Sequence, residues 1–591
     1  MLIKKLFRKS EAYYTISDLS KAIGPIIDLM VVSLFIGPNA VTVLGYIAPL
    51  IMLFELIGTA ISSGSRNEVS SLIGAGEVDE ANRAFSGAVI MGGGLAVIIA
   101  ILIYIFGSGV AFVLGARDPE IGLMTRQYIY GYLIGFPFFT LTRILTPYLQ
   151  MEGEYIRVSA TSMLTTVIDV LGDLFIVFVL HGGMFGIGLA TSLGYVIPFF
   201  VYATFFFGRK KRSIFKLTLK GVTPKLCINL FILGAPAGVV KASNSVGGIL
   251  INNMLTSFKM AYLVAAYGIF SQIAVFVRSS WYAPADTLHA FAGIFIGEED
   301  KYSLKKIQKI SLIDGLIYTS IVTVMLFAFA PLLAGVFLKS NDPKALELGV
   351  ECLRVACFSL PFNGIVYGFN NYLMAVKRIR FCNLYSFLIE CGAPVPITFL
   401  SLRILDYHGA WIAKVLTMST LCLIAAIYIY MNKEGDTFSD KMLLLPRSFG
   451  NLPEDEIAVT ATSTEEIMDM SMVAIAFAME HGADRSRARK FGLIVEELSC
   501  FMTEHGFDDG KSHNINMRLV SKDEDLIIRM RDDCKPFNLE EYFELIRADR
   551  KTEEDISLVI IFKMAKDVKY ISTFGANNLI LKYSNSPHQE V

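Results

Sequence analysis

Long runs of hydrophobic residues recur along most of the chain, and short polar segments separate them. Each run is about 20 residues or longer, which is the length that a helix needs to cross the hydrocarbon core of a bilayer. After residue 433 no such run occurs and charged residues become frequent. The pattern predicts twelve transmembrane helices, at residues 18–37, 42–63, 85–106, 125–147, 157–180, 184–207, 226–255, 260–284, 309–337, 347–374, 379–403 and 409–431.

The first six predicted helices and the last six resemble each other. Short identical stretches recur at one nearly constant spacing along the chain: Ile73-Gly74 with Ile296-Gly297, Gly186 with Gly409, Pro137-Phe138 with Pro361-Phe362, and Tyr148-Leu149 with Tyr372-Leu373. An even number of helices in each copy makes the two copies parallel. Transporters use such repeats as two bundles that rock around a central site.

Basic residues cluster at one set of predicted membrane boundaries. They precede the first helix (Lys4, Lys5, Arg8 and Lys9), fill the loop 208–224, and recur at Lys377, Arg378 and Arg380. The intervening loops carry almost none, so both termini are predicted to be cytoplasmic, in a plasma (inner) membrane. The beginning of the chain lacks the short apolar run of a signal peptide.

The C-terminal part has a mixed pattern. Helical periodicity at 464–481, 486–505, 539–547 and 556–566 combines with alternating stretches at 513–521, 525–532, 568–573 and 578–584. The fold class predicted is an all-α membrane protein with a C-terminal soluble α/β sandwich. Its divisions are an N-terminal six-helix lobe (1–207), a basic linker (208–224), a C-terminal six-helix lobe (225–432), a linker (433–459) and the soluble domain (460–591).

Composition excludes several classes of function. The chain is 54% hydrophobic and 18% charged, with a mean hydropathy of +0.53, which is typical of a protein that lies largely in lipid. A net charge of −1 argues against a nucleic-acid partner. The eight cysteines form no CxxC pair, and no catalytic, metal or cofactor constellation stands out. The chain is therefore predicted to be no enzyme.

Two carboxylates occupy one face of the fifth predicted helix. Asp169 and Asp173 are four residues apart, so both side chains project from the same side. A carboxylate at membrane depth costs at least a few kcal/mol, and a neighbouring like charge adds repulsion. We expect about one of the two to hold a proton or share a cation. The alternative is a pair that neighbouring donors satisfy within the bundle.

Four further polar side chains fall within predicted spans: Glu55, Lys241, Asn244 and Glu390. They are predicted to line the substrate path, and the alternative is that a lysine and a glutamate from different helices neutralise each other. Arg143 and Arg278 lie near helix ends and are predicted to reach the lipid headgroups.

Residues 15–432 resemble the multidrug and toxic compound extrusion (MATE) exporters. The resemblance rests on Gly24-Pro-Ile-Ile-Asp28, the glycine-rich acidic turn 72–82, the segment Asp169 to Phe175, and Phe185-Gly-Ile-Gly-Leu-Ala-Thr191. It implies a V-shaped antiporter that H⁺ or Na⁺ drives. It also implies a coupling-ion site at Asp28, Asp169, Asp173 and Thr191. Asp169 departs from the family pattern, which has asparagine there.

Residues 460–584 resemble the GHKL ATPase fold of anti-sigma-factor kinases, through Val495 to Gly506, Leu526 to Phe537 and Gly575 to Lys582. The resemblance places a catalytic acid at Glu497 and an adenine contact at Asp532. Phe501 stands where the family has a Mg²⁺-binding asparagine, Cys534 replaces a turn glycine, and Asp555 and Ser557 replace phosphate-loop glycines. A phenyl ring supplies no oxygen ligand for Mg²⁺, so Mg-ATP binding is disfavoured and a regulatory role with a cytoplasmic protein partner is expected.

The combined expectation is a cation-coupled antiporter that exports organic cations, drugs or toxic metabolites. One alternative is a flippase for a lipid-linked oligosaccharide or peptidoglycan precursor. A pyrophosphate would need a cationic cavity, whereas the first lobe carries three acids. The other alternative is a membrane sensor that signals through the C-terminal domain. Intact nucleotide-binding motifs would have supported a sensor, and they are missing here.

Overall fold

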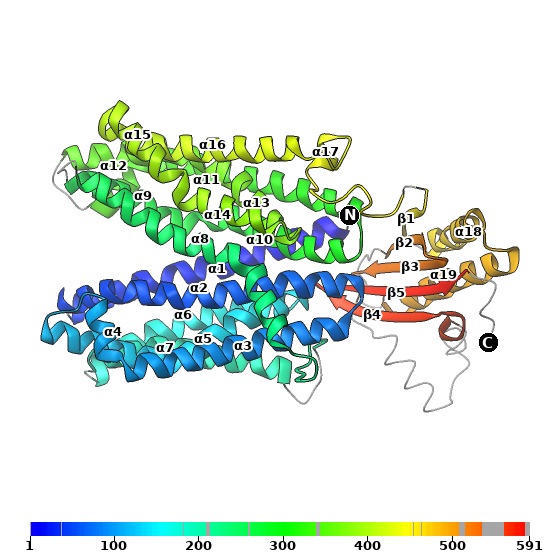
Figure 1. The fold of residues 1–591 in the computed structure, drawn as a ribbon, viewed down its shortest axis with the longest axis horizontal. Helices are drawn as coiled ribbons and strands as arrows, with labels where there is room; N and C mark the ends of the chain where they lie inside the picture. The colour runs from blue at the N-terminus through cyan, green and yellow to red at the C-terminus, as the bar shows by residue number, and fades with distance from the viewer. Residues whose placement is uncertain are drawn as a thin grey trace.

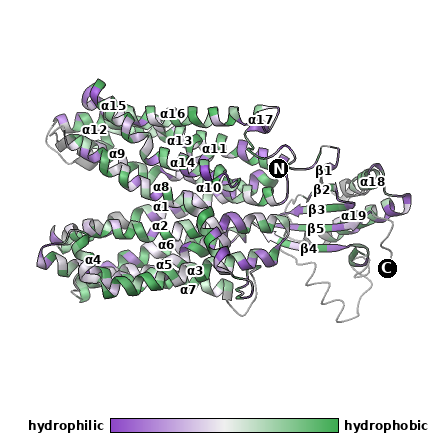
Figure 2. Ribbon diagram, viewed as in Figure 1, coloured by the Kyte–Doolittle hydropathy of each residue, from purple (hydrophilic) through white to green (hydrophobic). Residues whose placement is uncertain are grey.

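The computed structural model describes residues 2–36, 38–180, 182–207, 213–257, 261–338, 343–452, 454–461, 464–506, 515–534 and 561–585. The predicted helix at 539–547, most of that at 556–566, and Asp555 and Ser557 lie outside these ranges. A long helical bundle has a small sheet-containing unit at one end (Figure 1). We call that end of the bundle the domain end. Hydrophobic residues follow the bundle helices, and hydrophilic residues gather toward the domain end (Figure 2).

The first half of the bundle contains six long helices and one short one. They are α1 (Leu2–Phe35), α2 (Pro38–Ala75), α3 (Val78–Ile105), α4 (Gly107–Val113), α5 (Pro119–Met151), α6 (Tyr155–Phe175) and α7 (Met184–Phe207). A π-helical turn, Ile176–Leu180, continues α6.

The second half repeats this order with more breaks. Its helices are α8 (Pro224–Thr256), α9 (Ala261–Val277), α10 (Ser279–Gly297), α11 (Lys301–Leu338), α12 (Pro343–Ala356), α13 (Leu360–Ala375), α14 (Ile379–Phe387), α15 (Pro394–Leu405) and α16 (Gly409–Met431), with a π turn at Leu388–Gly392. The starts of α1, α2, α3, α5, α6 and α7 precede those of α8, α9, α11, α12, α14 and α16 by almost the same spacing in every case. Helix boundaries thus follow the predicted repeat spacing. Among the described residues, nine helical stretches are long and apolar enough to cross a membrane, and one of them, Ile379–Met431, contains α14 to α16.

Helix α2 lies between the halves and packs against both α8 and α10. A Cβ atom on Gly64 would lie 1.8 Å from the backbone oxygen of Leu230, and one on Gly234 would lie 1.7 Å from that of Ala60. Such distances are far below van der Waals contact, so only glycine lets the backbones of α2 and α8 approach this closely.

The contact between α2 and α10 at the domain end is nearly symmetrical. A Cβ atom on Gly74 would lie 2.1 Å from the backbone oxygen of Ile294, and one on Gly297 would lie 2.0 Å from that of Ser71. The repeat spacing separates Gly74 from Gly297, and it separates Ser71 from Ile294, so equivalent positions of the two repeats exchange the same contact. The halves therefore close on each other here through a pseudo-two-fold interface.

The C-terminal unit follows a short helix α17 (Phe438–Lys441) and contains an antiparallel sheet with the strand order β1-β2-β3-β5-β4. Its elements are β1 (Glu456–Ala461), α18 (Thr464–Glu480), α19 (Arg485–Gly506), β2 (Ile515–Lys522), β3 (Asp525–Asp532), β4 (Asp567–Thr573) and β5 (Ala576–Ser584). Strand β1, which the pattern did not predict, begins within the segment interpreted as a linker.

Each face of this sheet has a different partner. Alternate residues of β3, including Leu526, Ile528 and Met530, pack with Phe477 of α18 and Phe491 of α19 in one apolar core. The remaining positions of the strands point to the other face, and from it Arg518, Arg529 and Arg531 contact the helix ends of the bundle. The C-terminal unit is thus two layers, helices on sheet, with its second sheet face against the transmembrane part.

The glycine contact between α2 and α8 leads to a stability prediction. Gly234→Ala places a methyl group against the α2 backbone and should lower the free energy of unfolding by about 1–3 kcal/mol, as overpacking does. Gly248→Ala on the same helix is the matched control, because nothing lies within 4 Å of a Cβ atom there. Thermal unfolding in detergent measures both variants. Equal unfolding temperatures would contradict the close approach.

Candidate functional site

Asp169 and Asp173 of α6 are buried inside the first half. Asp169 is 9% exposed and Asp173 is 0% exposed. The regular helix ends directly after them, at Phe175, and the π turn Ile176–Leu180 follows. A π turn widens the helix locally and is frequent at functional sites. The two acids therefore sit at the point where α6 departs from regular geometry.

Helices α1 and α7 both pack along α6 and bring two more predicted residues to this place. Asp28 of α1 lies close enough to Asp169 for one carboxyl, when protonated, to donate a hydrogen bond to the other. The Thr191 hydroxyl of α7 is within hydrogen-bonding reach of Asp169 and also donates to the Ile187 carbonyl at 3.2 Å. The structure thus gathers Asp28, Asp169 and Thr191 around one point, with Asp173 one turn further along α6.

The carboxylate oxygens in this cluster are poorly satisfied. Within the described residues, Oδ1 of Asp28, Oδ1 of Asp169 and both side-chain oxygens of Asp173 are buried without a hydrogen-bond partner. Buried polar groups are nearly always hydrogen-bonded, and leaving one unpaired costs about 1–3 kcal/mol. Four such atoms close together mark this cluster as the candidate functional site.

Tyrosines that the sequence did not single out line this cluster. Tyr128 lies beside Thr191 and Asp169, and Tyr195 also lies near Asp169. Their rings continue through Tyr132, whose centroid is 6.3 Å from that of Tyr128 and 6.2 Å from that of Tyr195. In a chain with 12% aromatic residues, only the four-residue spacing of Tyr128 and Tyr132 could have marked them.

Glu55 forms an ion-pair group between the two halves. Its Oε2 accepts a hydrogen bond from Lys241 Nζ at 2.9 Å, and its Oε1 lies 3.6 Å from Arg143 Nη1. Arg278 Nε lies 3.4 Å from a carboxylate oxygen of Asp18. Arg143 and Arg278 thus each lie within ion-pair distance of an acid of the bundle, and their reach to the lipid headgroups stays a prediction.

Glu390 lies in the π turn of the second half and has different partners. Its carboxylate accepts hydrogen bonds from Asn244 Nδ2 at 2.6 Å and from the Tyr367 hydroxyl at 2.7 Å. No lysine or arginine of the described chain forms an ion pair with it. Lys241 therefore pairs with Glu55, whereas the Glu390 carboxyl group has neutral hydrogen-bond donors.

A second polar group between the halves was missed by sequence reasoning. Arg66 of α2 contacts His289 Nδ1 of α10 at 2.6 Å and lies 4.0 Å from Asp286, which accepts a hydrogen bond from Asn371 at 2.9 Å. Arg66 and His289 are themselves separated by the spacing of the repeat. That spacing, applied to polar residues as well as to glycines and aromatics, would have paired them.

The predicted nucleotide residues lie on the helix side of the C-terminal sheet. Phe501 is buried in the apolar core, and Glu497 lies in the same helix, α19. Asp532 Oδ1 accepts hydrogen bonds from Asn577 Nδ2 at 2.7 Å and from the Cys534 N–H at 2.9 Å. Burial raises the pKa of Asp532 despite these donors. Asn577 and the Cys534 N–H thus bind the carboxylate that the resemblance assigns to adenine contact.

Comparison with known proteins bears on the bundle. A family model described as MatE matches residues 15–175 and 236–399, and neither range reaches the C-terminal unit. The multidrug export protein MepA of Staphylococcus saprophyticus is 24% identical over 435 residues, covering 73% of this chain and 94% of that protein. The probable multidrug resistance protein YoeA of Bacillus subtilis is 20% identical, covering 71% and 92% respectively.

The fold of the bundle is similar to a solved structure of a multidrug resistance MATE family transporter of the MOP superfamily in an outward-facing conformation. The TM-score is 0.68 at 18% identity, over 72% of this chain and 94% of that one.

Proposed function

The chain belongs to the MatE family of transporters, and on this basis we propose that it is a cation-coupled antiporter that exports small organic cations, drugs or toxic metabolites. As a secondary transporter of this family it is not an enzyme. The relatives named for multidrug export align with the whole bundle, which supports a drug-like substrate.

The observation that carries the proposal is the unsatisfied carboxylate cluster. Both oxygens of Asp173 are buried without a partner among the described residues, and Asp28 and Asp169 each leave one oxygen in the same condition. Buried like charges at close range cannot all remain ionised without a counter-ion. Binding of H⁺ or Na⁺ removes that penalty, and its release restores it.

Cation binding is coupled to transport if the free-energy cost of the cluster without a bound cation differs between the conformations of the transporter. A cation can shift an equilibrium between two states only as far as it binds one state more tightly than the other. The cluster is built from α1, α6 and α7, and α1 also packs against α10 of the second half. Neutralising Asp28 therefore acts on a helix that contacts both halves, and this links ion binding to their relative movement.

The substrate path is proposed to pass Glu55, Lys241, Asn244 and Glu390. Among these, Glu390 is the side chain suited to an organic cation, because its carboxylate has hydrogen-bond donors but no cationic partner in the described chain. Glu55 is shared between Lys241 and Arg143, and a cationic substrate could compete with either for its carboxylate.

The domain end is proposed to be cytoplasmic, with the bundle in the plasma (inner) membrane. Basic residues at the start of α1 and between α13 and α14 lie at this end, where the positive-inside rule places them on the cytoplasmic side. The C-terminal unit is proposed to be a degenerate GHKL-like domain that regulates transport and contacts a cytoplasmic protein partner. Helices packed on one face of an antiparallel sheet support the resemblance, and the buried Phe501 and the occupied Asp532 support loss of Mg-ATP binding.

Removing a charge from the cluster should stop export. Asp28→Asn or Asp173→Asn should reduce ethidium efflux from proteoliposomes, driven by an imposed H⁺ or Na⁺ gradient, to the level of protein-free vesicles. An amide stays neutral, so the cluster no longer responds to the cation. Glu120→Gln, which alters an exposed acid of the same half, is the matched control. Normal efflux by either cluster variant at equal reconstitution would refute the assignment.

Asp169→Asn should behave differently, because it restores the family pattern and leaves two acids. We expect export to persist but to require a coupling-cation concentration about tenfold higher, since a unit charge a few Å away contributes at least about 1.4 kcal/mol at an effective dielectric constant near 20. Efflux rates measured across a series of H⁺ and Na⁺ concentrations give this value. An unchanged concentration dependence would remove Asp169 from the coupling site.

The C-terminal unit should not hydrolyse ATP. Phosphate release by the purified full-length protein with Mg-ATP should equal the background of protein-free detergent, because Phe501 cannot ligate Mg²⁺. Hydrolysis above background that disappears in Glu497→Ala would show a working ATPase and overturn the degenerate interpretation.

A further inference from the structure

The face of the C-terminal sheet opposite its apolar core carries more basic than acidic side chains. Its basic residues are Arg518, Lys522, Arg529, Arg531, Lys569 and Lys582, and its acids are Glu456, Asp525 and Asp567. Three consecutive acids, Glu298, Glu299 and Asp300, follow the end of α10 directly opposite. The sheet and the domain end of the bundle are therefore complementary in charge.

Ion pairs join this face to the second half of the bundle. Arg531 Nη2 lies 2.6 Å from Glu298 Oε2, and both side chains are at most 13% exposed. Arg518 donates to the backbone oxygens of Glu298 and Glu299 at 3.2 and 3.1 Å. Buried charge-assisted contacts of this kind are stronger than surface pairs. The sheet is firmly attached to the end of α10.

Contacts to the first half are mostly neutral. Phe574 and Ala576 share an apolar cluster with Leu6 of α1. A Cβ atom on Gly153, which follows α5, would lie 2.6 Å from the backbone nitrogen of Gly575. Arg529 Nη1 donates to the backbone oxygen of Gly74, at the end of α2, at 3.2 Å. The Phe574 N–H donates to the Met151 oxygen at the end of α5. The exposed pair between Lys5 Nζ and Asp533 Oδ2, at 2.8 Å, adds little, as surface pairs generally do.

Phe574 is the point where the two sets of contacts meet. It occupies the turn between β4 and β5 and is 3% exposed. Its ring stacks on Phe291 of α10 at a centroid distance of 4.2 Å, while its backbone bonds the end of α5. One residue of the C-terminal unit thus touches both halves at their closed end.

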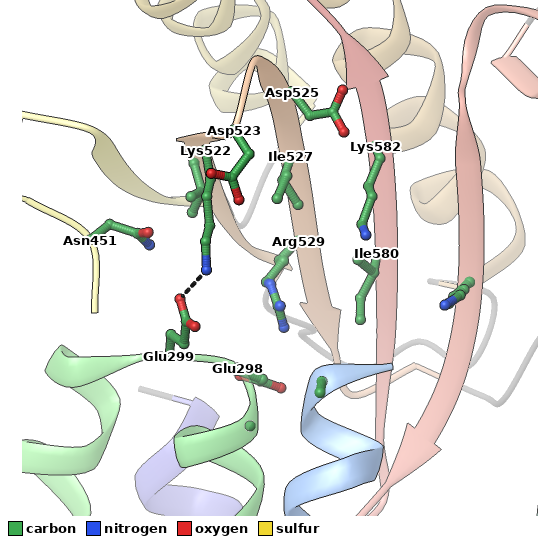
Figure 3. Close-up of a pocket in the computed structure, with 14 residues that line it drawn as sticks. Glu298, Glu299, Asn451, Lys522, Asp523, Asp525, Ile527, Arg529, Ile580 and Lys582 are labelled. Carbon is green, nitrogen blue, oxygen red and sulfur yellow. Dashed lines mark hydrogen bonds and ion pairs between the residues drawn. The ribbon is translucent and has the colours of Figure 1, made fainter. Parts of the chain in front are cut away.

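The joint is incompletely packed. A cavity of about 270 Å³ remains between the sheet and the helix ends, with Ala75 of α2 and Gly297 of α10 in its lining (Figure 3). Figure 3 also shows Arg529 pointing from the sheet toward the helix ends, beside the Lys522–Glu299 pair. Groups around this cavity lose fewer close contacts on separation than groups in a filled interface would.

We propose that the C-terminal sheet is a clamp that holds the domain end closed, and that it releases the first half while it stays attached to the second. The domain end opens only if α2 and α10 separate, since their backbones are in contact at Gly74 and Gly297. A body bound to both helix ends opposes that separation. The largely neutral contacts to the first half break before the buried ion pairs to α10. This clamp rests on the proposed transport cycle and assigns the C-terminal unit its regulatory action.

The first test measures opening directly and needs no transported compound. Ser70 of α2 is buried against Gly293 of α10, so Ser70→Cys reports separation of the two helices through its rate of maleimide modification, measured by mass spectrometry in the purified protein. Adding Arg529→Ala should raise that rate about tenfold, because a hydrogen bond from a charged donor is lost. Lys582→Ala, on the same sheet face, is the matched control and should leave the rate unchanged. Equal rates for Arg529→Ala and the parent would overturn the clamp.

The second test asks which half is released. A bismaleimide link between Lys5→Cys and Asp533→Cys ties the sheet to the first half, and one between Arg531→Cys and Glu298→Cys ties it to the second. Because the start of α1 also contacts α10, a third link between Ala75→Cys of α2 and Lys569→Cys, which both line the cavity, ties the sheet to α2 directly. The links to α1 and α2 should keep modification of Ser70→Cys slow even with Arg529→Ala, and the link to Glu298→Cys should not. The reverse result would contradict release from the first half. Loss of efflux with normal modification rates would count against the transport proposal and leave the clamp in place.

Discussion

The backbone contact between α2 and α10 is the constraint on which the arrangement of the halves depends. Gly74 meets Ile294 and Gly297 meets Ser71, and these four positions are related by the repeat. An interface made of equivalent positions is self-complementary, as in a two-fold dimer. Because the contact is between backbones, it is either closed or absent and offers no intermediate packing. Such bistability suits a gate.

Polar residues extend this interface along α2. Arg66 and His289, again equivalent by the repeat, contact each other, and Asp286 lies 4.0 Å from the same guanidinium group. Further along, Glu55 of α2 pairs with Lys241 of α8. Ion pairs between the halves can break when the bundle rocks and re-form when it returns, whereas an apolar seam would expose surface to water at every cycle. The carboxylate cluster lies on α1, α6 and α7, separate from this interface. In the proposed transport cycle it acts on the interface through α1.

The helices of the bundle and their repeat could be predicted from the sequence, because both depend on local patterns of residues. Apolar runs predict spans, and the starts of equivalent helices follow the spacing of the short identical stretches. Asp28, Asp169 and Thr191 were assigned from the resemblance to a family, and the structure brings them together. The ion pairs of Arg143 and Arg278 were not predicted, because a position along a helix does not reveal which acid on another helix faces it. Tyr128 and Tyr195 were missed since their role depends on packing around α6.

In the C-terminal unit, the sequence pattern predicts strands but does not predict which parts of the chain they contact. Strand alternation identifies two faces in β3 but not their partners. The face of Leu526 and Ile528 joins the helices α18 and α19, whereas the face of Arg529 and Arg531 meets the bundle. A basic sheet face reads from the sequence as solvent-exposed. Here the ends of α2 and α10 cover it, together with the acids Glu298, Glu299 and Asp300 that follow α10. The asymmetry of its contacts, ionic to α10 and mostly neutral to α2 and α5, breaks the two-fold symmetry of the gate beneath it. A symmetrical gate has no preferred half to move, and an appended unit held more tightly by one half supplies that preference.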